Sequence, residues 1–129
     1  MKNKIEMWQT KIDNFPNEIF VEGLHDDYEG FRLIVRGGKP SRVFRIRFES
    51  HLGYRNFDES ERLKLISLFP SSSNGWSLFK TENSSFIDWI VEESYEAHVT
   101  RDEITHYFVV TPNDIVEILT TEEPIIEIL

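Results

Sequence analysis

The chain contains no cysteine among its 129 residues. Disulfide bonds, thiolate metal sites and cysteine nucleophiles are therefore excluded. The lack of cysteine also fits a reducing compartment, so we expect a cytoplasmic protein. No uncharged apolar run approaches the roughly 18 to 20 residues that cross a bilayer. Lys2 and Lys4 precede no apolar segment, so we expect neither a signal peptide nor a membrane association.

The chain also lacks the short motifs that identify common sites. It has no GxGxxG, GxxxxGK[ST], HExxH, EF-hand or GxSxG pattern. Its four histidines stand at no metal-binding spacing, and His106 lies in an apolar run where a hydrogen-bonded core histidine is usual. We therefore expect no metal, no cofactor and no assigned catalytic residue, and enzymatic activity stays an open but less favoured alternative.

Positive charge is concentrated in one segment of this acidic chain, and that segment contains no acidic residue. The net charge is −9, yet residues 31–48 contain six bases and no acid. The last 48 residues contain twelve acids and one base, Arg101. An acidic protein repels nucleic acid at long range, and salt screens a local basic block within about 8 Å. We expect no nucleic-acid partner.

The basic segment predicts a β-hairpin. Phe31, Leu33 and Val35 alternate with polar residues, and the same alternation returns from Arg42 to Glu49 after the Gly37-Gly38 turn. Side chains repeat every second residue in a strand, so each strand has one apolar face. The opposite face collects four arginines. They are Arg32, Arg36, Arg45 and Arg47.

The remaining pattern predicts an α+β fold in a single domain over residues 1–129. Further strands are expected at Ile19–Leu24, Trp76–Thr81, Ile104–Thr111, Asp114–Leu119 and Ile125–Leu129. A helix is expected from Asp58, with Glu61 at capping-box spacing, to Phe69. A second begins after Ser84 or Ser85 and runs to about Tyr95. We predict a mostly antiparallel sheet of five to six strands with two helices packed on one face.

Two uses of the arginine face remain open. The arginines can hold an anion, because cross-strand guanidinium groups present many fixed donors to phosphate or carboxylate. Alternatively, acidic side chains of the same chain lie between them and neutralise them. The first alternative predicts a small anionic ligand or a substrate. Its binding set consists of Arg32, Arg36, Arg45 and Arg47 with the nearby His51, Tyr54 and Arg55.

The acidic C-terminal block suggests a protein partner instead. Glu92, Glu93 and Glu96 crowd the end of the second predicted helix, where the helix dipole disfavours negative charge. Trp89 lies beside the apolar stripe of that helix and can serve as an interface anchor. Together with Glu122 and Glu123, these residues form the predicted partner-binding set. Electrostatic complementarity would favour a basic protein.

Two stretches carry a resemblance to known proteins. They are residues 75–89, with Gly75-Trp76-Ser77-Leu78-Phe79-Lys80 and Phe86-Ile87-Asp88-Trp89, and residues 106–124, from His106-Tyr107-Phe108 to Glu122-Glu123-Pro124. They resemble small uncharacterised acidic bacterial proteins, and the size and charge are similar to immunity proteins that neutralise bacterial toxins. The resemblance implies a non-catalytic protein-binding module.

Pairing of two copies through an exposed edge at Ile125–Leu129 would give a homodimer.

Overall fold

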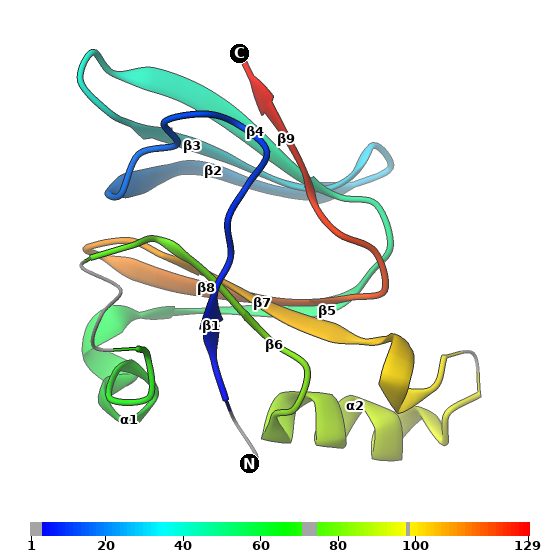
Figure 1. The fold of residues 1–129 in the computed structure, drawn as a ribbon. Helices are drawn as coiled ribbons and strands as arrows, with labels where there is room; N and C mark the ends of the chain where they lie inside the picture. Colours follow the sequence, from blue (N-terminus) through cyan, green and yellow to red (C-terminus); the bar gives the residue numbers. More distant parts are fainter. Residues whose placement is uncertain (1–3, 71–74, 98) are drawn as a thin grey trace.

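Two antiparallel sheets stack face to face, and two short helices cover the outer side of one of them (Figure 1). The computed structural model describes residues 4–70, 75–97 and 99–129. Sheet A has five strands in the order β1-β6-β7-β8-β5, and sheet B has four in the order β2-β3-β4-β9. The chain therefore builds three layers, with sheet A in the middle.

The strands of sheet A are β1 (Glu6–Met7), β5 (His51–Asp58), β6 (Leu78–Thr81), β7 (Thr105–Val110) and β8 (Asp114–Thr120). Those of sheet B are β2 (Ile19–Asp27), β3 (Gly30–Gly37), β4 (Arg42–Phe48) and β9 (Ile125–Ile128). The helices are α1 (Leu63–Ile66) and α2 (Ser85–Ser94), and 3₁₀ turns lie at Glu59–Glu61 and Arg101–Glu103. No helix in the described ranges is long and apolar enough to cross a membrane.

The antiparallel α+β build is confirmed, but the prediction of one sheet of five to six strands is wrong. The apolar face of the β3–β4 hairpin packs against the inner face of sheet A. Sheet A can serve as a middle layer because β7 and β8 are apolar on both faces. Tyr107 and Val109 face the core between the sheets, while Phe108 and Ile115 face the helices.

The hairpin in sheet B forms as predicted. Leu33 pairs with Ile46 and Val35 with Phe44, and all four side chains are fully buried. Arg32 stands opposite Arg47 in the same register. Because the apolar set faces sheet A, the arginines face solvent on the outer side of sheet B.

The helix predicted over Asp58–Phe69 is wrong for most of its length. Strand β5 runs through Asp58, whose side chain accepts the Ser60 amide and starts a 3₁₀ turn. Only Leu63–Ile66 is α-helical, and Leu65 is its one buried residue. The pairing of β5 with β8 prevails over the helical pattern of the local sequence.

The second predicted helix is confirmed as α2. The Ser84 hydroxyl caps it by accepting the Ile87 amide, and Tyr95 ends it in the left-handed conformation at φ 55°. Phe86 and Ile87 bury its apolar stripe against Leu119 of sheet A. Both helices thus lie on the same side of sheet A (Figure 1).

Candidate functional site

Acidic side chains lie among the four predicted arginines on the outer face of sheet B. The ion pairs join Arg32 to Asp27 and Glu29, Arg36 to Glu22, Arg45 to Glu127, and Arg47 to Glu49 and Glu127. Of these acids, only Glu127 belongs to the acidic C-terminal block. The structure therefore shows the arginines neutralised from within the chain, mostly by acids that are close in sequence.

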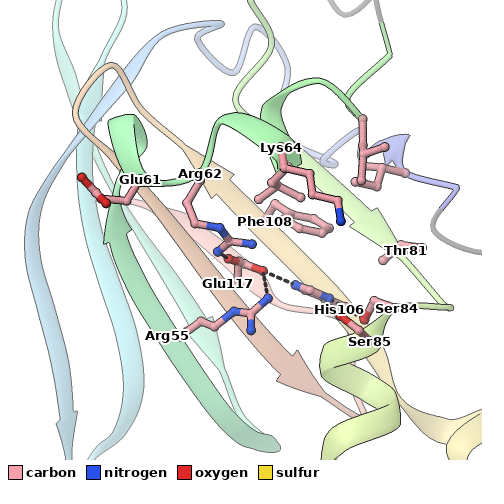
Figure 2. A pocket seen from close by; sticks show the side chains of 13 residues that line it. Arg55, Glu61, Arg62, Lys64, Thr81, Ser84, Ser85, His106, Phe108 and Glu117 are labelled. Atoms are coloured by element: carbon pink, nitrogen blue, oxygen red, sulfur yellow. Dashed lines mark hydrogen bonds and ion pairs between the residues drawn. The ribbon is translucent and has the colours of Figure 1, made fainter.

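The other three members of the predicted ligand set lie elsewhere. His51 and Tyr54 stack on Phe31, with ring centroids 5.0 and 4.6 Å away. His51 also lies 3.7 Å from Asp26. Arg55 points to the opposite side of β5, toward the helices (Figure 2). The seven residues that the sequence grouped by proximity are thus divided over three places in the fold.

The predicted partner-binding set is divided between two places. Trp89, Glu92 and Glu93 are exposed on α2, and Glu96 follows the helix and accepts the Arg101 amide. Glu122 and Glu123 lie in the turn before β9. They accept hydrogen bonds from the Ser50 hydroxyl and the Trp8 indole, respectively, and so hold that turn against the rest of the molecule.

The structure also assembles a polar cluster that the sequence prediction missed, on the outer face of sheet A. Its centre is Glu117, in the middle of β8, whose side chain is 0% exposed. Arg55 is its direct cross-strand partner on β5, and Phe108 is its partner on β7. Arg62 reaches the same carboxylate from the segment before α1 (Figure 2). Two strand pairings and a loop therefore place these groups together.

Glu117 is shared by three side chains. Arg55 Nη2 donates to Oε1 at 2.9 Å, Arg62 Nη1 forms a close ion pair with Oε2, and His106 Nε2 lies 2.9 Å from Oε1. Burial lowers the pKa of Arg55, and burial followed by the charge of Arg55 lowers that of Arg62. Both guanidinium groups remain charged at neutral pH. The buried carboxylate is therefore held by two cations.

His106 extends the cluster toward α2. Its Nδ1 lies 2.8 Å from the Ser84 hydroxyl, which also accepts the Ile87 amide. Burial, and then the charges of Arg55 and Arg62, lower the pKa of His106 to about 3. The ring is therefore neutral at pH 7. We assign its proton to Nε2, because this tautomer donates to Glu117 and accepts from Ser84.

The Ser84–His106–Glu117 chain contains the residue types of a hydrolase triad. Its chemistry differs from that of such a triad in two respects. A histidine with a pKa of about 3 is a weak base at neutral pH. The Ser84 hydroxyl is also occupied as the helix cap. The arrangement therefore favours a fixed support for the start of α2 over an activated nucleophile.

A cavity of about 380 Å³ opens above this cluster, between α1 and α2 (Figure 2). Its apolar lining includes Leu65, Leu68 and Phe108, and the Phe108 ring stacks on His106 of the cluster. Lys64 and Ser85 also line the cavity. In the described part of the chain, no three His, Cys, Asp or Glu side chains gather as a metal site requires.

A signal for the cluster was present in the sequence. Glu117 is a single acid inside the apolar run Ile115–Leu119, and a fully buried glutamate needs a partner. The sequence does not identify that partner, because Arg62 and Arg55 are 55 and 62 positions away.

Comparisons with protein families, with curated proteins and with solved structures found no match to this chain. The functional argument therefore rests on the arrangement of its own residues.

Proposed function

We propose that the protein is a binding module that docks a basic segment of another protein on the exposed side of α2. The observation that carries the proposal is the composition of that surface. Trp89 is 54% exposed on a helix whose other aromatic residue, Phe86, is buried. Glu92 and Glu93 follow it by three and four residues and so share its side of the helix.

The charges of this surface support a basic partner. Glu92 and Glu93 make no ion pair with any residue in the described ranges. They lie in the last turn of α2, where the helix dipole disfavours each carboxylate by roughly a few tenths of a kcal/mol. The arginines of sheet B already have their own acids, so they offer these two glutamates no counter-charge. A cationic partner would supply it.

The aromatic residue supports a specific contact. Tryptophan and arginine are the residues that most often contribute large binding energies at protein interfaces, usually at the centre of a polar rim. Here Trp89 lies beside a shallow hollow that Arg55 and Phe86 also line, and the Arg55 guanidinium lies 4.2 Å from the Phe86 ring centre. The acidic rim would speed association with a basic protein, and the tryptophan would slow its dissociation. Immunity proteins, which this chain resembles in size and acidity, illustrate such a role.

The test compares three tagged variants as baits in lysate of the source cell at physiological salt. Glu92→Lys with Glu93→Lys reverses the charge of the proposed surface, and Trp89→Ala removes its anchor. Asp13→Lys with Glu18→Lys makes the same change in net charge at two exposed positions elsewhere. We expect the wild type to capture a basic protein. The Asp13→Lys, Glu18→Lys variant should capture the same protein, whereas the Glu92→Lys, Glu93→Lys variant and Trp89→Ala should not. Capture of the same protein by all variants, or of none by the wild type, would contradict the proposal.

A further inference from the structure

The cavity between α1 and α2 combines an apolar wall with a cationic end. Its volume of about 380 Å³ lies within the range of small-molecule pockets, which are mostly apolar and contain a few converging polar groups. Leu65, Leu68 and Phe108 supply the apolar wall, and Arg55 and Arg62, which converge on Glu117, form the cationic end. A ligand that fills this space needs an apolar part and a charged part.

The cationic end has more donors than the protein itself uses. Three cations, Arg55, Arg62 and Lys64, line the cavity against the two carboxylates of Glu61 and Glu117. Each guanidinium has five N–H donors, and Glu117 accepts one from each arginine. Within a chain of net charge −9, this excess of positive charge favours an anion.

One buried donor at this end lacks an acceptor. The Nε atom of Arg55 is buried and has no hydrogen-bond partner among the residues that the structure describes. Buried donors are almost always paired, so the protein leaves this guanidinium with a donor that it does not use. A carboxylate or phosphate oxygen is the natural partner of a guanidinium group.

The start of α2 adds to this preference. Ser85, the first of the ten residues of the helix, lines the cavity, and the Ser84 side chain satisfies only the Ile87 amide. The first amides of a helix have no acceptor within it, and its dipole attracts negative charge. This feature acts together with the arginines at the same end of the cavity.

We propose that the cavity binds a small organic anion, with its carboxylate or phosphate group at Arg55, Arg62 and the start of α2, and its apolar body against Leu65, Leu68 and Phe108. The buried Glu117 holds the two arginines in place for this ligand, and the hydrogen-bond chain through His106 holds the helix start. The protein-binding surface proposed above lies on the solvent side of α2, and the hollow beside Trp89 shares Arg55 and Ser85 with this cavity.

The test measures thermal stabilisation by four defined probes. Phenyl phosphate and hexanoate carry both parts of the proposed ligand, inorganic phosphate lacks the apolar part, and hexanol lacks the charge. We expect a saturable rise in melting temperature with phenyl phosphate or hexanoate and a much smaller rise with the other two. Which of the two succeeds identifies the preferred head group. The proposal is overturned if neither does, or if hexanol or inorganic phosphate stabilises equally.

The matched variants separate binding from folding. Replacing Arg62 would leave Glu117 short of a partner, so the variant of choice is Ser85→Glu, which places a carboxylate at the exposed cavity rim. A glutamate in the first turn suits the helix dipole, so this variant should fold normally and lose the ligand-induced shift. Gln9→Glu adds the same charge at an exposed position outside the cavity and should keep the shift. Equal shifts in both variants would also overturn the proposal.

Discussion

Two glutamates in this protein each bridge two arginines, one on either outer face of the sheet pair. Glu127 of β9 bridges Arg45 and Arg47 on the outer face of sheet B. Glu117 of β8 bridges Arg55 and Arg62 on the outer face of sheet A. The Glu127 side chain is 35% exposed, whereas that of Glu117 is 0% exposed, because helices cover only sheet A.

The difference shows that the same pairing has different consequences in the two places. On sheet B, water and salt screen the charges, so the ion pairs contribute little to stability and mainly keep the arginine face neutral. On sheet A, the carboxylate has lost its water and depends on the arginines and His106. Removing one member of an ion pair there leaves the charge of the other member uncompensated where little water can solvate it. The buried cluster is therefore the more sensitive of the two.

The largest effect is expected from Glu117→Gln. The amide keeps the size of the side chain and one hydrogen-bond acceptor but leaves Arg55 and Arg62 without a counter-charge. We expect a loss of about 3–5 kcal/mol in the free energy of unfolding, measured by urea denaturation. Glu127→Gln is the matched control because it makes the same chemical change on a partly exposed carboxylate between two arginines. Similar losses in both variants would show that burial does not distinguish the two sites.

An intermediate effect is expected from acid. His106 has a pKa of about 3 in the folded protein against an ordinary value of 6.5. Above pH 6.5 it is neutral in both states; between pH 6.5 and 3 the unfolded chain binds the proton first. This histidine therefore lowers stability as the pH falls through that window, by at most about 1.4 kcal/mol per pH unit.

The groups that face His106 are Glu117, Ser84 and, through their charge, Arg55 and Arg62. Urea denaturation at pH 7, 6 and 5 gives the free energy of unfolding, and hence its slope against pH, for the wild type and for His106→Gln. Other titrating groups are common to both proteins, so we expect a flatter slope in the variant over this range. Equal slopes would mean that His106 does not have a lowered pKa.

The smallest effect is expected from Glu127→Gln. Hydrogen bonds from Arg45, and then from Arg47, lower the pKa of Glu127, yet 35% of the Glu127 side chain stays exposed to water. We expect a slight loss of stability that disappears in about 1 M salt, where the screening length is about 3 Å. The corresponding loss for Glu117→Gln should persist in salt. A large, salt-resistant loss at Glu127 would remove the contrast between the two faces.

The sequence predicted the elements whose residues alternate clearly or carry a cap. The β3–β4 hairpin, the cap at Ser84 and the strands β7, β8 and β9 all follow from local patterns. The predicted edge at Ile125–Leu129 does form the edge strand β9 of sheet B, with Ile125 and Ile128 exposed. Homodimerisation through it stays a prediction. Strand β5 was missed because its residues show little alternation, and its conformation depends on pairing with β8.

The sequence by itself determined the separation of charge and the four arginines on one face of a hairpin, because strand periodicity is a local property. Only the tertiary structure decided what those charges meet. The registers of β5 and β7 against β8 bring Arg55 and His106 to Glu117, and a shift of one residue would turn Glu117 to the other face. Distant segments meet through packing and strand pairing, which no local pattern specifies.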